Sequence, residues 1–136
     1  MKYLLDTNVC IALINGTSSK VRARFAQVAR LKAALATSVI VVHELWYGVA
    51  KSELAAQNAR ALAIFLNSGI AVLDYSEKDA QAAGEIRAEL ERRGERIGEY
   101  DTLIAGQAYC RNLTLVTANT REFTRVKSLS VEDWTD

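Results

Sequence analysis

Short apolar runs alternate with longer helical patterns along this chain of 136 residues. A buried strand reads as a short apolar run, whereas an amphipathic helix repeats its apolar residues every three to four positions. Strands that alternate with helices are typical of a parallel sheet covered by helices on both faces. The sequence therefore predicts an α/β fold, and its length fits one domain spanning residues 1–136.

Capping residues and glycines place the ends of these elements. Ser76, with Asp79 three residues later, resembles a capping box, and Ser52 is expected to cap the start of another helix. The predicted strands cover residues 1–5, 37–40, 70–73, 113–117 and 129–131. The predicted helices cover residues 9–15, 20–34, 41–50, 52–67, 76–93, 99–111 and 120–123.

Charge is nearly balanced, with 17 basic and 16 acidic residues and a formal net charge of +1. This balance argues against a polyanion-binding tail, although a local basic cluster can still bind nucleic acid. Cys10 and Cys110 form no metal-binding spacing and are expected to be buried free thiols. Because there is no signal-peptide pattern and no apolar run long enough to span a membrane, we expect a soluble, cytoplasmic protein.

Polar residues follow two of the predicted strands. Asp6 comes directly after the first strand, and Thr117-Ala118-Asn119 follows the fourth run in the same way. Open α/β sheets bind their ligands beyond the carboxyl ends of the strands. Helix capping by Asp, Asn or Thr explains the same residues equally well. Taken alone, these positions leave both interpretations open.

Two further carboxylates lie on helix faces that should be buried. Asp101 is on the apolar stripe of the helix 99–111, and Glu44 is on that of the helix 41–50. A carboxylate on such a stripe is costly unless a partner compensates its charge. Separate Arg or Lys partners are the structural alternative, but one shared cation accounts for Asp6, Glu44 and Asp101 together.

The types of donor indicate the chemistry. Carboxylates with no usable His or Cys set favour Mg²⁺ or Mn²⁺ over zinc, and the single histidine, His43, is interpreted as a helix-surface or packing residue. Divalent ions held in this way bind phosphates, activate water and neutralise charge in phosphoryl displacement. The sequence has no Ser–His pair, phosphate-cradling glycine loop or GxGxxG motif. We therefore expect metal-dependent hydrolysis of a phosphodiester.

Four blocks of sequence occur in order along the chain: MKYLLDTN, HELWYG, IGEYDTLIAG, and LVTANTREFTRV with SLSVEDW. Together they resemble the PIN-domain ribonucleases, most closely the VapC-like toxins of bacterial type II toxin–antitoxin systems. The resemblance covers essentially the whole chain. It implies a single PIN-like domain with a small parallel sheet flanked by helices. It also implies a metal-dependent endoribonuclease, using Mg²⁺ or Mn²⁺, that is the toxin of such a pair.

The resemblance implies a role for each matching residue. The family's first three acids, which hold the metal ion, correspond to Asp6, Glu44 and Asp101. Its fourth catalytic position, often Asp, is Asn119 here, which would act as a neutral ligand or hold a water molecule. The lost negative charge favours one tightly held ion over two. The hydroxyls that support the family's site match Thr7 and Thr117.

Residues near Asn119 extend this pattern. Glu122 either contributes a charge in place of the missing acid or caps its own helical turn. Arg121, Arg125 and Lys127 are the preferred contacts to RNA phosphates, whereas the basic residues of the helix 20–34 are interpreted as a solvated face. The low aromatic content argues against a wide base-stacking platform.

The resemblance also implies partners. These are a second copy of the chain in a homodimer and a VapB-like antitoxin that inserts a peptide near the acidic pocket. The other end of the antitoxin binds DNA, so the toxin meets DNA only indirectly. Trp46 and Tyr47, beside Glu44, are candidates for these contacts, although a Trp on an apolar stripe is more simply explained as core.

Two alternatives keep the same fold: a structure-specific DNase and a non-catalytic PIN-like binding module. Nothing in the sequence separates RNA from DNA as the substrate. A phosphoacceptor module is disfavoured, because a DxD phosphatase needs a second Asp where Asn8 stands and a receiver domain needs adjacent acids early in the chain.

Overall fold

A parallel sheet with strand order β3-β2-β1-β4-β5 forms the centre of the computed structural model, which describes residues 2–31 and 34–135. The strands are β1 (Tyr3–Leu5), β2 (Leu35–Ser38), β3 (Ala71–Leu73), β4 (Thr114–Val116) and β5 (Val131–Glu132). The helices are α1 (Thr7–Asn15), α2 (Ser19–Arg30), α3 (Val39–Lys51), α4 (Ala55–Leu66), α5 (Glu77–Arg92), α6 (Glu99–Cys110) and α7 (Thr120–Phe123). The predicted α/β class with a parallel sheet is confirmed.

The central strand β1 sets the position of the polar edge. It pairs in parallel with β2 on one side and with β4 on the other, and Leu5 lies opposite both Thr37 and Val116. Because all five strands are parallel, their carboxyl ends share one edge of the sheet. Asp6 and Thr117, each one residue beyond this register, therefore lie next to each other at that edge.

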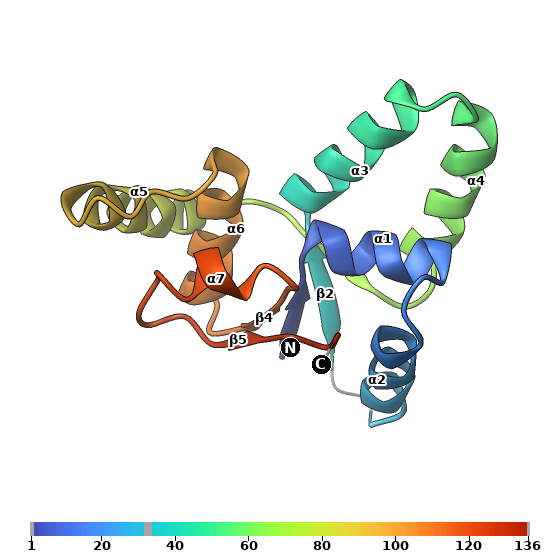
Figure 1. Cartoon of the computed structure of the whole chain (residues 1–136), viewed down its shortest axis with the longest axis horizontal. Helices are drawn as coiled ribbons and strands as arrows, with labels where there is room; N and C mark the ends of the chain where they lie inside the picture. Colours follow the sequence, from blue (N-terminus) through green and yellow to red (C-terminus); the bar gives the residue numbers. More distant parts are fainter. Residues whose placement is uncertain (1, 32–33, 136) are drawn as a thin grey trace.

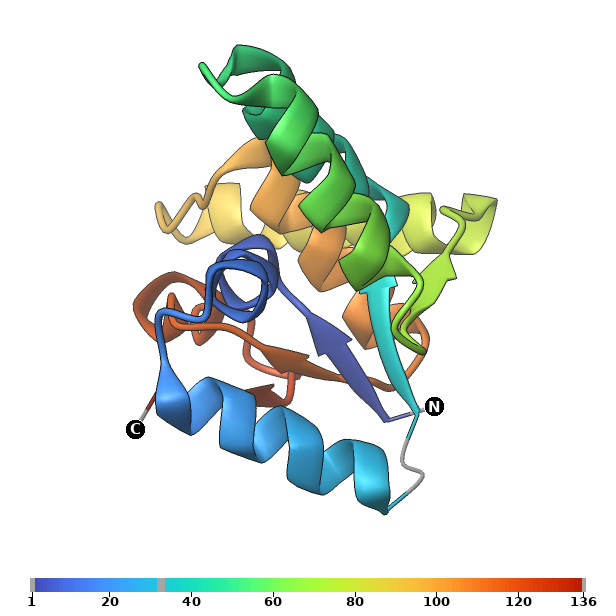
Figure 2. The ribbon, with the colours of Figure 1, turned by 90° about the vertical axis from the view of Figure 1, so that its right-hand side faces the viewer.

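Helices cover the sheet on both sides. Figure 1 shows α5 and α6 on one side of the strands and α1 and α2 on the other. Helices α3 and α4 pack side by side and extend beyond the carboxyl edge of the sheet (Figure 2). The apolar stripe of α6 is fully buried against the sheet, with Ile104, Ala105 and Ala108 at 0% exposure. This burial brings the first turn of α6, with Asp101, to the carboxyl edge.

Several element boundaries differ from the sequence-based expectation. The second strand ends at Ser38 instead of residue 40, because the Ser38 hydroxyl accepts a hydrogen bond from the Ile40 N–H (3.0 Å) and begins α3. Ser52 does not start a helix: its hydroxyl donates to the Val49 carbonyl (2.7 Å) and closes α3, while α4 begins at Ala55. The last strand covers Val131–Glu132 rather than 129–131.

Other expectations fall partly outside the described residues or are corrected by burial. Met1 of the first predicted strand and residues 32–33 of the second predicted helix lie outside the described residues. Both cysteines are free, as expected, but only Cys10 is buried, because Cys110 ends α6 at the surface. None of the helices in the described ranges has the length and apolarity that a membrane crossing requires.

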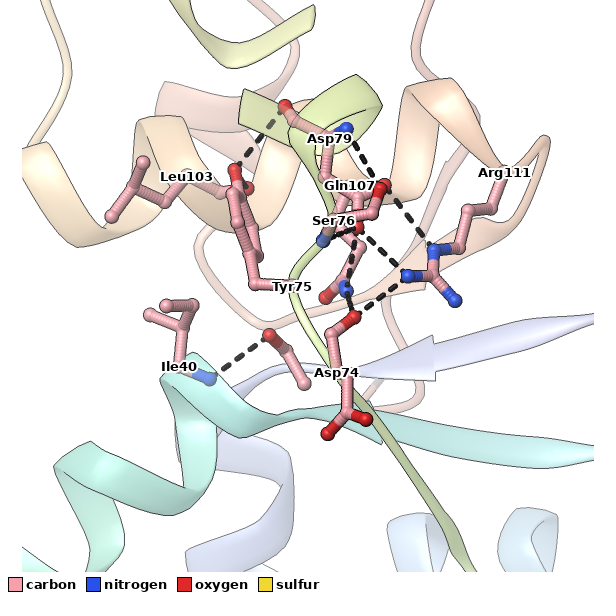
Figure 3. Close-up of polar contacts among 9 residues, drawn as sticks. Ile40, Asp74, Tyr75, Ser76, Asp79, Leu103, Gln107 and Arg111 are labelled. Atoms are coloured by element: carbon pink, nitrogen blue, oxygen red, sulfur yellow. Dashed lines mark hydrogen bonds and ion pairs between the residues drawn. The ribbon is translucent and has the colours of Figure 1, made fainter. Parts of the chain in front are cut away.

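An ion pair between a buried carboxylate and a partly exposed guanidinium joins α5 to the C-terminal end of α6. Asp79 is fully buried and accepts hydrogen bonds from Arg111 (2.8 and 3.2 Å), from the Gln107 amide (3.3 Å) and from the Ser76 N–H (2.8 Å), as Figure 3 shows. The Ser76 hydroxyl completes the predicted capping box by accepting from the Asp79 N–H. Burial alone would raise the pKa of Asp79, but the hydrogen bonds from Arg111 and Ser76 outweigh it and lower the pKa to about 2.

The two helices also approach each other closely at a glycine. A Cβ added to Gly106 of α6 would stand 2.6 Å from the Cα of Ala83 in α5, well inside van der Waals contact. Only glycine allows α6 to lie this near to α5. The depth of α6 in the fold, and therefore the position of Asp101, depends on this contact.

We predict that Gly106→Ala destabilises the protein by about 1–3 kcal/mol, because the new methyl group meets backbone atoms that cannot move aside. Gly84→Ala on α5 is the matched control, since nothing lies within 4 Å of its added Cβ. That change should stabilise the protein by up to about 1 kcal/mol through helix propensity alone. Urea unfolding of both variants measures the difference, and equal effects would contradict the close-contact argument.

Candidate active site

Asp6 lies at the carboxyl end of β1 with both carboxylate oxygens engaged. Oδ1 accepts from the backbone N–H of Thr7 and Oδ2 accepts from the hydroxyl of Thr117, each at 2.8 Å. Asp6 is the N-cap residue of α1 and is 4% exposed, so it starts a helix and also belongs to the polar edge. Burial raises the pKa of Asp6, and the two hydrogen bonds only partly oppose that rise.

Glu44 comes to the same edge from α3. The stripe that predicted an inward direction is present, because Val41 and Leu45 are buried beside the half-buried Glu44. The Thr7 hydroxyl donates to Glu44 Oε1 at 2.8 Å. Thr7 therefore joins Asp6 to Glu44, through its backbone N–H on one side and its hydroxyl on the other.

Asp101 lies in the first turn of α6 and faces the other acids. Gly98, the N-cap residue, leaves space for it: a Cβ at Gly98 would stand 3.4 Å from Asp101 Oδ2. The pKa of Asp101 rises to about 7, first because of burial and then because of the negative charges of Asp6, Glu122 and Glu44. The four carboxylates therefore share one region, where they repel each other.

Glu122 is the fourth acid, and its place was left undecided by the sequence. The side-chain amide of Asn119 donates to Glu122 Oε2 at 3.0 Å. After burial and the charge of Asp6, the charge of Glu122 contributes to the raised pKa of Asp101. The side chain of Asn119 forms no capping hydrogen bond with the backbone of α7, so helix capping does not explain Asn119. The available sequence signal was the spacing of three residues between Asn119 and an acid in the same helical turn.

Hydrogen bonds connect most residues of the site in one continuous series. The Asn119 N–H donates to the Thr117 hydroxyl at 3.0 Å, and Thr117 in turn donates to Asp6. The continuous series runs through the following residues: Glu44, Thr7, Asp6, Thr117, Asn119 and Glu122. Residues from the ends of β1 and β4 thus orient acids that α3 and α7 contribute.

These carboxylates differ from the buried Asp79 in having no cationic partner. Over residues 2–31 and 34–135, none of Asp6, Glu44, Asp101 and Glu122 takes part in an ion pair, whereas Asp79 pairs with Arg111. The alternative of separate Arg or Lys partners is therefore not found in the described part of the chain.

The donor set suits a hard divalent cation, because all its donors are carboxylate, hydroxyl or amide oxygens. The side chains are oriented by one another but not closed around a point. In the described ranges, no three His, Cys, Asp or Glu side chains already lie close enough to hold a metal ion. Ion binding would draw the carboxylates inward and offset the repulsion that, after burial, raises the pKa of Asp101.

Comparison with known proteins agrees with this arrangement. A sequence model of the PIN domain matches residues 3–129. The chain belongs to the PIN domain family. It is 42% identical over 134 residues to the tRNA(fMet)-specific endonuclease VapC of Shigella flexneri and to the ribonuclease VapC2 of Rickettsia felis, with 98% of each chain covered.

Solved structures show the same PIN fold. A crystal structure of VapBC2 from Rickettsia felis bound to a DNA fragment from their promoter superposes with a TM-score of 0.92 and 41% identity. That comparison covers 98% of this chain and 99% of the other. The DNA-bound VapBC from Salmonella typhimurium gives a TM-score of 0.90 and 40% identity, with 98% of both chains covered. The predicted resemblance is confirmed.

The basic residues selected for RNA contacts are not all at the acidic edge of this PIN domain. Arg121 is exposed on α7, next to Glu122 in the chain. Arg125 instead donates to the Arg96 carbonyl (2.8 Å), and Lys127 lines a hollow beside α5. Of these three residues, Arg121 is the one that shares a helical turn with an acid of the site, Glu122.

Trp46 and Tyr47 of α3 are exposed by 43% and 61%, respectively. The simpler explanation that Trp46 belongs to the core is therefore wrong. Leu45, between Glu44 and Trp46, is the residue of this segment that enters the core. Both aromatic side chains are available for contact with another protein.

We predict that the stability of the PIN domain in EDTA depends on pH through Asp101. The pKa in the folded state is about 7, above the ordinary value of 3.8, so ionisation of this group opposes folding. The contribution of Asp101 to the free energy of unfolding is complete below about pH 4 and is lost as the pH rises through about 7. The urea midpoint should fall over this range in the wild type and less steeply in Asp101→Asn.

Glu99→Gln is the matched control, because it removes an exposed carboxylate from the same helical turn and keeps Asp101. This variant should retain the wild-type dependence on pH. An Asp101→Asn profile parallel to that of the wild type would contradict the raised pKa.

Proposed function

We propose that this chain is a metal-dependent endoribonuclease and the toxin of a type II toxin–antitoxin pair. The observation that carries the proposal is a group of carboxylates at the carboxyl edge of the sheet, which have no cationic partner within residues 2–31 and 34–135 and among which Asp101 has a pKa of about 7. Relatives that match nearly the full chain at 42% identity are named ribonucleases or endonucleases.

Asp6, Glu44 and Asp101 would hold one Mg²⁺ or Mn²⁺ ion, with Glu122 as the fourth acid of the pocket. When bound, the ion would neutralise phosphate charge and activate water for attack on the phosphodiester. Thr7 and Thr117 fix the two oxygens of Asp6, so the carboxylate keeps its direction. Asn119 acts by orienting Glu122 through its amide.

Asp101 has a further part in this mechanism. A carboxyl group whose pKa lies near neutrality can hold or release a proton under working conditions. Binding of a cation would favour the ionised form, so Asp101 would release its proton as the site is filled. We propose Asp101 as both a ligand and the group that couples metal binding to pH.

The partners follow from the same proposal. Solved relatives are complexes of VapB with VapC, two of them bound to DNA. We propose that this chain forms a homodimer in the cytoplasm and binds a VapB-like antitoxin. The antitoxin would contact DNA, so this chain would meet DNA only through its partner. Trp46 and Tyr47, both exposed, are candidates for these protein contacts.

The first test is cleavage of a structured RNA pool, with initiator tRNA included because the Shigella relative is named for it. We predict cuts with Mg²⁺ or Mn²⁺ and none with EDTA. Asp6→Asn, Glu44→Gln and Asp101→Asn should each lower the rate by at least about a hundredfold, since each removes a charge from the site. Gel analysis and sequencing of the ends report the outcome.

Glu99→Gln again serves as the control and should cleave at the wild-type rate. A DNA strand of the same sequence tests the DNase alternative. RNA cleavage that persists in Asp6→Asn would reject the site, and metal binding without cleavage of any nucleic acid would favour the non-catalytic PIN-like module.

A second prediction concerns Asn119 and Glu122. Asn119→Asp adds a negative charge beside Glu122 and should tighten Mn²⁺ binding several-fold, whereas Glu122→Gln should weaken it by about tenfold. Titration calorimetry measures both affinities. Unchanged affinity in a variant would remove that residue from the surroundings of the ion.

A further inference from the structure

An exposed ring pair bridges the two helices that carry Glu44 and Asp101. His43 of α3 and Tyr100 of α6 meet with Nε2 and Oη 3.3 Å apart, and their ring centroids are 5.4 Å apart at an interplanar angle of 52°. Each ring belongs to the residue directly before an acid of the site. The ring pair therefore joins α3 to α6 at the positions that directly precede Glu44 and Asp101 in the chain.

The exposure of these rings is not explained by packing alone. Tyr100 is 48% exposed and His43 is also exposed, so the contact between the helices leaves part of each side chain accessible to solvent. A residue that served only to hold α3 against α6 would gain more by burying its ring. The hydrogen bond instead restricts how Tyr100 can turn, which lowers the entropy cost of using its face for binding.

The charge of the site gives such a surface a purpose. Asp6, Glu44, Asp101 and Glu122 form an acidic cluster, whose charge repels the phosphates of a nucleic acid wherever a bound ion does not neutralise it. Stacking of a base on an aromatic ring does not depend on net charge and can offset that repulsion. A strand whose phosphate lies at the carboxylates carries bases on either side of it, and a ring pair on the two helices that supply Glu44 and Asp101 can accept one of these bases.

We propose that His43 and Tyr100 form a stacking site for one nucleobase of the RNA substrate, next to the phosphate that is cleaved. The proposal rests on the RNA-cleaving function proposed above and assigns part of its substrate selection to this ring pair. Two rings offer room for a single base. This agrees with the low aromatic content of the chain, which argues against a wide base-stacking platform.

The test uses a short RNA that contains the cleavage site, with steady-state kinetics for the wild type, Tyr100→Phe and Tyr100→Leu. Tyr100→Phe keeps the ring face, so KM should stay within about twofold of the wild type. Tyr100→Leu removes the face and should raise KM by about tenfold, with kcat and Mn²⁺ affinity little changed. A Phe variant as impaired as the Leu variant would overturn the proposal, because the hydroxyl would then be the essential group.

An abasic substitution scan separates stacking from a structural effect. In the wild type, removal of the stacked base should raise KM by about tenfold at one position near the cut. In Tyr100→Leu the same removal should have no further effect, because the partner of that base is already absent. Equal abasic penalties in both proteins at every position would overturn the proposal.

A binding experiment keeps the test independent of catalysis. RNA carrying 2-aminopurine at successive positions is titrated with Asp6→Asn protein, with and without the added Tyr100→Leu change. Stacking predicts fluorescence quenching at one position that disappears with Tyr100→Leu, and no such position would overturn the proposal. Failure of the wild type to cleave any RNA would instead count against the proposed nuclease function.

Discussion

Mutual repulsion between carboxylates at one edge of the sheet is the constraint on which the rest of the site depends. Parallel pairing of β1 with β2 and β4 brings Asp6 to the edge, and α3, α6 and α7 add Glu44, Asp101 and Glu122. Burial first raises the pKa of Asp101, and the charges of the neighbouring acids raise it further. Such a group persists because hydroxyl and amide donors hold it and because a cation can neutralise it.

The remainder of the fold supplies the rigidity that this arrangement requires. Asp79, fully buried and paired with Arg111, ties α5 to α6, and Gly106 allows the two helices to approach closely. Asp79 and Asp101 show opposite treatments of a carboxylate on neighbouring helices. Asp79 has a guanidinium partner and a low pKa, which serves structure. Asp101 is half-buried near the charges of three other acids and has a raised pKa, which suits binding.

Local sequence signals predicted most elements because they act over a few residues. The capping box at Ser76 and the short helical turn at 120–123 were both expected and are both present. The predicted helix boundaries were wrong at two serines, because a serine hydroxyl can cap the start of a helix or form a hydrogen bond at its end. Ser52 was expected to start a helix but closes α3 instead, and Ser38 begins α3 within the segment expected to be strand. The choice depends on tertiary packing, which capping patterns do not record.

The sequence by itself determined the α/β class and the carboxylates that interrupt apolar stripes, because periodicity is a property of residue order. It also carried the resemblance to the PIN-domain family, because the four matching blocks are runs of consecutive residues. Only the tertiary structure decided where Glu122 lies: it shares a short turn with Asn119, and its charge acts on Asp101 of a helix distant in sequence. It also decided that His43 and Tyr100 meet beside the acids. Such contacts depend on how helices far apart in sequence cross, which local patterns do not specify.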